Sequence, residues 1–319
     1  MIINNSNDFL IKLVAVAVLL VSTVAGIQVS SAAETAKIAI VYPDVRAPFI
    51  EVFNEIIEGV RSVTPSNTET IVLTQGMGVE ALTQQLADKN IGPLIVLGSR
   101  GLGMSAEING SRKIVSGAAV STPADCPEHV SCLSMLVSPQ KMFQQLLSMV
   151  PKIKTIHVVY GEGRDEWLIQ LAAVAAKQAG LKFQAVAVSS VMASAQYYQR
   201  ILPELGKDDA LWLLQRDASL KDSNLLAKIL ERAWLQDYVV FSNNPSHVKK
   251  GALFAMYPDN KALGATLGNL VLNLERGQSN AVTALENLQV AVNIRTAEHL
   301  QLDISRAQRE QFDLVFPSR

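Results

Sequence analysis

The sequence predicts an α/β protein made of two doubly wound parallel-sheet lobes joined by a hinge. Short apolar runs rich in Val, Ile and Leu alternate along the chain with amphipathic helical runs. Continuous apolar strands separated by helices are typical of parallel sheets that are covered on both faces. This alternation occurs twice, once before and once after a segment that contains the two cysteines. Two successive series of this kind indicate two lobes.

The first 33 residues differ in character from the rest of the chain. Lys12 and the amino terminus give a weakly positive start, residues 13–27 are almost wholly apolar, and residues 31–33 (SAA) are small. This pattern predicts a signal peptide over residues 1–33, cleaved after Ala33, and therefore a periplasmic protein. A retained signal anchor is the alternative. No Cys follows the apolar run, so we expect no lipid anchor.

The expected first lobe begins with KIAIVY at residues 37–42, a buried strand by its length and branching that ends at Pro43. The helix at residues 48–61 that follows places Phe53, Ile56 and Val60 on one face. The same reasoning predicts strands at residues 70–73, 94–97 and 113–118, and helices at residues 80–88 and 104–108.

The second series follows the cysteine segment. The helix at residues 167–179 stops at Gly180, as a helix with a glycine C-cap does. We predict strands at residues 155–160, 182–188, 210–214 and 238–241, and further helices at residues 141–150, 195–205 and 224–236. After Gly251 come a strand at 253–256, a helix at 261–276 and a mixed tail. The expected lobes are residues 34–122 with about 246–284, and residues 123–245 with about 285–319.

Charge and cysteine content restrict the partners. Lys and Arg number 28 against 29 Asp and Glu, with no run of like charge, so a nucleic acid partner is not expected. Cys126 and Cys132 are the two cysteines, and in an exported protein they predict one disulfide that closes a small loop. His129 lies between them, but this spacing matches no zinc pattern, so no metal is expected.

Ligands of open parallel sheets bind at the loops beyond the carboxyl ends of the strands. These loops are rich in Ser, Thr, Asn, Gln and Gly, which hydrogen-bond a ligand without performing chemistry. The composition favours binding over catalysis. The loops are expected at residues 43–49, 74–78, 98–103, 119–122, 161–164, 189–194, 215–219 and 242–246.

Some side chains near these loops are candidate ligand contacts. Arg100 and Arg164 follow strands, one in each lobe, and would hold an anionic group; surface arginines at loop ends are the alternative. Asp217 would accept a ligand ammonium, or else cap the helix that follows it. Phe49 and Tyr257 would stack on an apolar ligand, or else belong to the core.

The sequence offers little support for an enzyme. Residues 101–106 (GLGMSA) fit the pattern G-x-G-x-x-A of dinucleotide-binding folds, but they follow the third strand and no acidic residue ends the next one. We therefore expect no cofactor. No serine hydrolase, zinc protease or Walker motif occurs.

The last third of the chain resembles a known family. The segments ALWLLQRD, YVVFSNNPSHVKKGAL, YPDNKALG, NLERG and VNIRTAEHLQLDI are similar, in order and spacing, to the ABC-transporter substrate-binding proteins that include tryptophan- and tyrosine-binding members. The resemblance implies a type I periplasmic-binding-protein fold. It also implies that Ser99, Asp217 and Ser242, with Asn243 beside it, contact the ligand. Gln215 and Arg216 depart from the family, in which a proline commonly precedes the Asp.

Together these observations predict a monomeric periplasmic solute-binding protein. It would close two lobes on a small amino-acid-like or anionic ligand and deliver that ligand to a membrane permease driven by an ATPase. Two alternatives stay open. One is an orphan periplasmic sensor or interaction protein of the same fold, and the other is an exported α/β enzyme.

Overall fold

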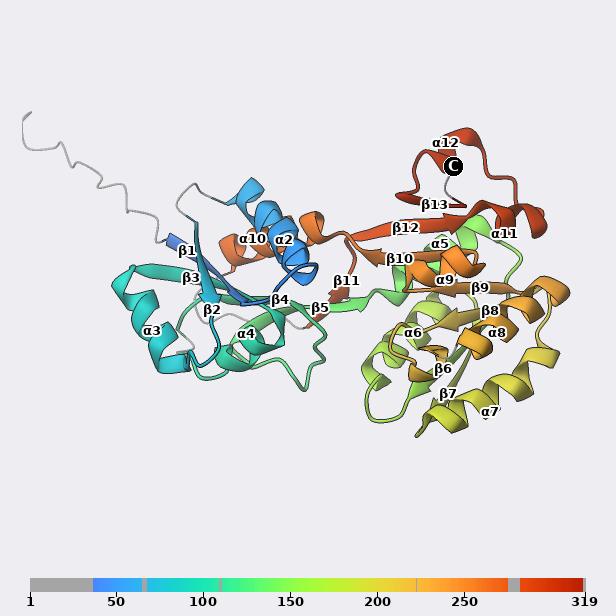
Figure 1. The fold of residues 1–319 in the computed structure, drawn as a ribbon, viewed down its shortest axis with the longest axis horizontal. Helices are drawn as coiled ribbons and strands as arrows, with labels where there is room; N and C mark the ends of the chain where they lie inside the picture. Colours follow the sequence, from blue (N-terminus) through green and yellow to red (C-terminus); the bar gives the residue numbers. More distant parts are fainter. Residues whose placement is uncertain (1–36, 65–67, 109–110, 222, 275–281, 318–319) are drawn as a thin grey trace, which may run out of the picture. The chain divides into compact units, whose positions relative to one another are not determined.

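The computed structural model describes residues 37–64, 68–108, 111–221, 223–274 and 282–317 (Figure 1). The predicted signal peptide, residues 1–33, lies outside these residues. None of the helices in the described ranges has both the length and the apolarity that crossing a lipid bilayer requires.

Five strands from the first half of the chain and one late strand, β11, form a six-stranded sheet with the strand order β11-β5-β4-β3-β1-β2 (Figure 1). The pairs between these strands are parallel. The strands are β1 (Lys37–Pro43), β2 (Glu69–Leu73), β3 (Ile91–Leu97), β4 (Ile114–Ala119), β5 (Val130–Val137) and β11 (Thr283–Leu285). The helices of this lobe are α2 (Phe49–Val63), α3 (Val79–Asp88), α4 (Gly98–Ser105) and α10 (Asn260–Asn273).

Both faces of this sheet are buried, as the apolar strands predict. In β1, Ala39 and Val41 belong to one core cluster, while Ile38 and Ile40 belong to another. The first cluster includes side chains of α3 and α4, and the second includes side chains of α2 and α10. Helices therefore cover both faces, which is the doubly wound arrangement.

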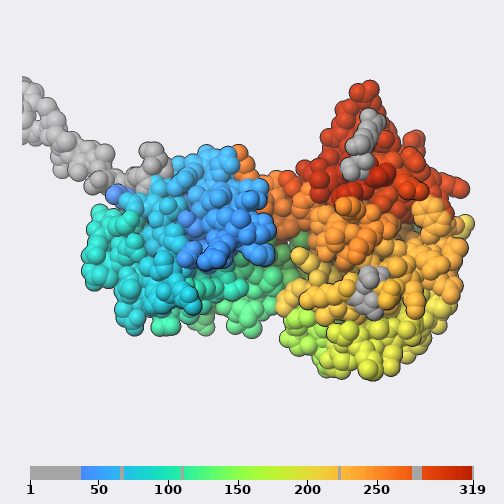
Figure 2. Space-filling view, viewed as in Figure 1, coloured from blue at the N-terminus to red at the C-terminus, as the bar shows by residue number. Residues whose placement is uncertain are grey.

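Helices α2 and α10 are far apart in the sequence but lie side by side (Figures 1 and 2). Glycines make this close approach possible. A Cβ atom built on Gly264 would lie 2.0 Å from the carbonyl oxygen of Ile56, and one built on Gly59 would lie 2.0 Å from that of Lys261. A late segment of the chain thereby completes the first lobe.

The second half of the chain forms a seven-stranded sheet with the order β13-β12-β10-β9-β8-β6-β7. Its pairs are parallel except for the antiparallel pair of β10 and β12. The strands are β6 (Thr155–Gly161), β7 (Lys182–Val188), β8 (Asp209–Leu213), β9 (Val239–Ser242), β10 (Phe254–Pro258), β12 (Leu288–Asn293) and β13 (Leu314–Phe316).

Helices and short 3-10 turns surround this second sheet (Figure 1). They are α5 (Pro139–Met149), α6 (Glu166–Gln178), α7 (Val191–Ile201), η1 (Leu202–Glu204), η2 (Ala218–Lys221), α8 (Ser223–Gln236), α9 (Pro245–Lys250), α11 (Ile294–His299) and α12 (Arg306–Arg309).

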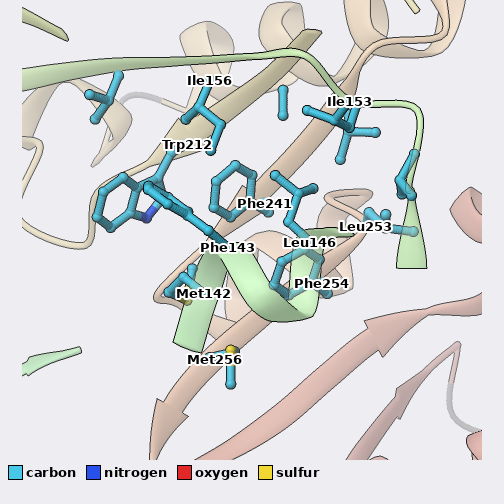
Figure 3. Close-up of a cluster of buried hydrophobic side chains, with 14 of the residues drawn as sticks. Met142, Phe143, Leu146, Ile153, Ile156, Trp212, Phe241, Leu253, Phe254 and Met256 are labelled. Atoms are coloured by element: carbon cyan, nitrogen blue, oxygen red, sulfur yellow. The ribbon is translucent and has the colours of Figure 1, made fainter. Parts of the chain in front are cut away.

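An aromatic cluster fills one face of the seven-stranded sheet (Figure 3). The rings of Trp212 and Phe241 stack with centroids 6.1 Å apart, and Phe143 meets Trp212 edge to face at 5.6 Å. The buried indole nitrogen of Trp212 donates a hydrogen bond of 2.8 Å to Asn243 Oδ1. The core therefore holds Asn243 in place at the carboxyl end of β9.

The fold class predicted from the sequence is confirmed, with two differences in strand membership. β5 falls in the range expected for the second lobe but pairs with β4 in the first sheet. Its sequence, VSCLSMLV, buries Ser131 and Ser134 among apolar residues, so no continuous apolar run marks it as a strand. β10 falls in the range expected for the first lobe but pairs with β9 in the second sheet.

Candidate ligand-binding site

The candidate site is a pocket of about 970 Å³, a size within the range of small-molecule sites. Ser99, at the start of α4, and Thr122, after β4, contribute from the first sheet, together with the end of β5. The loops after β6, β8 and β9 contribute Arg164, Arg216 and Asn243. The carboxyl ends of the parallel strands thus supply the pocket lining, as the sequence predicts.

A buried carboxylate organises the charged side of the pocket. The Asp165 side chain is only 1% exposed. It accepts hydrogen bonds from Arg164 Nη2 at 2.8 Å, Arg164 Nε at 3.1 Å and the Gly161 amide at 3.1 Å. Arg216 Nη1 lies 3.7 Å from its other oxygen. The hydrogen bond to Asp165 raises the pKa of Arg164.

Two guanidinium groups therefore line the pocket, with Arg164 hydrogen-bonded to Asp165 and Arg216 in a longer ion pair with it. Their side chains keep 39% and 36% exposure, so both Arg164 and Arg216 have surface left for a ligand. Lys221 adds a third cation to the lining and makes no ion pair within the described ranges. This side of the pocket suits an anionic group.

The lining of the pocket also includes part of the cysteine loop. Asp125 Oδ2 accepts hydrogen bonds from the amide of Thr122 at 2.9 Å and from its hydroxyl at 2.7 Å. The predicted disulfide between Cys126 and Cys132 is present, and Cys132 lies on β5. The disulfide thus ties the loop that carries Thr122 and Asp125 to the sheet.

Of the side chains predicted to contact ligand, Ser99, Arg164 and Asn243 line this pocket. Asp217 lines a smaller cavity of about 230 Å³ near the ends of β6 and β7, which shares Arg164, Asp165, Leu214 and Ala218 with the lining of the larger pocket. Its carboxylate accepts hydrogen bonds from Tyr198 at 3.0 Å, and from the amide and hydroxyl of Ser219 at 2.9 Å and 2.6 Å. These contacts match the alternative role, in which Asp217 caps the helical turn that follows it.

The other four predicted contacts lie elsewhere. Arg100 donates to the carbonyl oxygens of Leu73 at 2.9 Å and Met77 at 2.8 Å, so it joins two loops. Ser242 is fully buried and donates to the Leu213 carbonyl oxygen. Phe49 is 69% exposed at the start of α2.

Tyr257 packs against the core of the seven-stranded sheet. Burial raises the pKa of its hydroxyl to about 12, with help from Asp313 and Asp259. Its packing therefore matches the alternative assignment of Tyr257 to the core.

Sequence reasoning did not single out Asp165, Arg216 or Lys221 as contacts. Arg216 falls within a loop that was expected to bind ligand, and Asp165 directly follows Arg164. The adjacency of Arg164 and Asp165 is the one feature of the sequence that could have indicated an ion pair at this loop. An ion pair with a residue some fifty positions away could be found only from the fold.

The comparisons with known proteins agree with this architecture. A substrate binding protein with adhesive properties from Clostridium difficile, in a ligand-free, open structure, is 16% identical with a TM-score of 0.61, and the match covers 89% of this chain and 100% of that one. The ABC domain from Streptococcus pneumonia in complex with L-Trp is 15% identical with a TM-score of 0.52, over 88% and 99% of the chains. A conserved domain protein from Vibrio cholerae is 18% identical with a TM-score of 0.51, over 88% and 100%.

These likenesses show the fold. No curated protein matches the chain in sequence. The model of the ABC transporter substrate binding protein family matches residues 113–309, which is more than half of the 319 residues. The chain belongs to the ABC transporter substrate binding protein family.

Proposed function

We propose that this protein is exported to the periplasm, captures a small amino-acid-like or anionic ligand in the 970 Å³ pocket, and delivers it to an ABC permease. Membership of the family supports solute binding and a transporter partner. The Streptococcus structure, which is similar in fold, holds L-Trp. The ligand is released chemically unchanged.

The observation that carries the proposal is the group formed by Asp165, Arg164 and Arg216. A guanidinium group binds a carboxylate or phosphate through parallel N–H···O bonds. Asp165 holds Arg164 by hydrogen bonds before the ligand arrives and attracts Arg216 across 3.7 Å. Side chains that are already ordered lose little conformational entropy on binding. Arg164, Arg216 and Lys221 outnumber the lining carboxylates Asp125 and Asp165, which favours a ligand with an anionic group.

Asp125 is placed to accept an ammonium group. Its Oδ2 atom is occupied by Thr122, and its Oδ1 atom makes no hydrogen bond within the described residues. An amino-acid-like ligand would thus place its carboxylate toward Arg216 and its ammonium toward Asp125. A purely anionic ligand would use the arginines alone.

The test is a thermal-shift screen of the mature protein against amino acids, small organic acids and nucleobases, followed by calorimetry on each hit. A ligand that binds the folded state raises the melting temperature. Arg216→Gln should weaken the hit by roughly thirtyfold, equivalent to about 2 kcal/mol for a charge-assisted hydrogen bond. Arg61→Gln, an exposed arginine on α2, is the matched control and should bind normally.

Two results would contradict the proposal. One is a screen in which no compound raises the melting temperature. The other is the appearance of a reaction product when the protein is incubated with its ligand.

A further inference from the structure

A second pocket, of about 540 Å³, lies on the lobe of the seven-stranded sheet. It is bordered by α8, by the end of α9 and by the start of α11. None of its lining residues belongs to the lining of the 970 Å³ pocket. It is therefore a separate site.

An exposed tryptophan forms one wall of this pocket. Trp234 on α8 is 47% exposed, although indole is among the most apolar side chains. Its ring stacks on the imidazole of His299, with centroids 3.6 Å apart and planes 12° apart. His299 Nε2 lies 2.8 Å from the Trp234 carbonyl oxygen and 3.1 Å from Asp237 Oδ1. The indole is thus held in place while much of its surface stays exposed.

Three cations share the lining of this pocket with the indole. Lys249, Lys250 and Arg295 line the pocket and have no carboxylate within ion-pair distance in the ranges that the structure describes. Glu231 is the one carboxylate of the lining, so the pocket carries two net positive charges. Asp237, which directly follows the end of α8, is already paired with Lys207 and His299.

Hydrogen bonds hold the cationic side of the pocket together. Asn293 Nδ2 donates to the Val248 carbonyl oxygen at 2.8 Å, and its Oδ1 accepts from the Thr296 amide. The Thr296 hydroxyl donates to the Gly251 carbonyl oxygen at 2.9 Å. These bonds join the end of α9 to the start of α11, so the pocket exists without a ligand.

We propose that this pocket is a second binding site, for a small planar molecule that carries an anionic group. The ring of the ligand stacks on Trp234, and its phosphate or carboxylate group binds Lys249, Lys250 and Arg295. Stacking on an indole combined with charge-assisted hydrogen bonds gives affinity for such a ligand and discriminates against its neutral analogue. The site does not depend on what the larger pocket binds.

Tryptophan fluorescence tests the electrostatic part of the proposal. Trp212 is fully buried and Trp167 is half-buried, so Trp234 is the most accessible of the three tryptophans. Iodide should quench its emission severalfold more strongly than caesium does, because the surrounding cations attract the anion. Trp234→Phe should remove the accessible component. In the triple variant K249Q/K250Q/R295Q this preference for iodide should be lost, because Glu231 is then the one charged side chain in the lining.

Adenosine 5′-monophosphate and adenosine provide a matched pair of probes for the ligand class. The monophosphate should quench Trp234 emission saturably, with adenosine binding at least about tenfold more weakly because it lacks the charge. Arg295→Gln should weaken monophosphate binding by about tenfold, whereas Arg61→Gln should leave it unchanged. The proposal would be overturned by an iodide preference that is no larger in the wild type than in the triple variant, by equal binding of the two probes, or by loss of binding in Arg216→Gln rather than Arg295→Gln.

Discussion

At the scale of single residues, burial decides which polar side chains can meet a ligand. Asp165 is almost fully buried, yet it acts through Arg164 and Arg216, whose side chains stay partly exposed. Asp217 is also buried, but its partners Tyr198 and Ser219 are themselves buried. A carboxylate at a strand end can therefore orient side chains that line the pocket, or hydrogen-bond buried groups and stabilise the fold. The groups around it decide which role it has.

Sequence could predict the loops of the pocket but not this choice. The segments at residues 119–122, 161–164, 215–219 and 242–246 contribute lining residues. The loop expected at residues 98–103 is wrong, because these residues form most of α4, and Ser99 lines the pocket from the start of that helix. Within residues 242–246, Ser242 and Asn243 are neighbours, and only Asn243 lines the pocket. Side-chain direction depends on contacts with distant elements, and those contacts are set by the fold.

His247 makes stability depend on pH. Its side chain is buried beside Ser242, and burial lowers its pKa from the ordinary 6.5, aided by Lys250 and opposed by Asp217. As the pH falls through about 6.5, the unfolded chain takes up a proton at this position that the folded chain does not. The free energy of unfolding should therefore decrease as the pH is lowered from 7.5 toward 5.5.

Urea unfolding at several pH values measures this effect. The decrease should be smaller in His247→Asn, and intermediate in Lys250→Gln, because removing the lysine charge raises the pKa of His247. The comparison uses the change with pH, so a loss of stability common to all pH values does not affect it. A decrease in His247→Asn as large as in the wild type would contradict the assignment.

At the scale of elements, α2 and α10 can pack closely because glycines, which have no side chain, occupy their contact. Gly264→Ala would place a Cβ atom 2.0 Å from a backbone oxygen, so the two helices would have to separate. We expect a loss of about 3 kcal/mol in the free energy of unfolding. Gly103→Ala, in α4, is the control, because a Cβ atom there meets nothing within 4 Å. It should be neutral or stabilise by up to about 1 kcal/mol. Equal effects of the two changes would refute this explanation.

The cysteine loop links stability to ligand affinity. Replacing Cys126 and Cys132 together by serine opens a loop of sequence separation 6, and should cost about 2 kcal/mol in unfolding free energy. The change also frees Thr122 and Asp125, which line the larger pocket. Calorimetry with the screened ligand should therefore show weaker binding under conditions in which the variant is folded. Unchanged affinity would mean that the loop is ordered without its disulfide.

The elements that sequence could not place are those with mixed character. β1, KIAIVYP, has a continuous apolar run after Lys37, and its observed bounds differ from the predicted ones by one residue. β5 contains buried serines, and Ser134 accepts a hydrogen bond from the amide of Ser121. A buried hydroxyl with a partner costs little. The sequence does not show whether a serine will have a hydrogen-bond partner inside the fold. The pattern of apolar residues therefore did not identify β5 as a strand.

At the scale of the whole molecule, the order of elements along the chain predicted the fold class, while tertiary contacts decided the boundaries. α10 packs on α2, so the chain returns to the first sheet after it has built most of the second. β11 and β12 are close in sequence but belong to different sheets. Such segments, which pass from one sheet to the other, are where a hinge is expected.

Ligand binding should therefore make the molecule more compact. The pocket is lined by loops of both sheets, and a ligand favours whichever arrangement of the sheets gives it more contacts. Small-angle scattering at a saturating concentration of the screened ligand should give a smaller radius of gyration than the free protein. Arg216→Gln at the same concentration should keep the larger value, because its site is unfilled. An unchanged radius in a sample that calorimetry shows to be saturated would mean that the pocket fills without closure, and delivery to a permease would then need a signal other than shape.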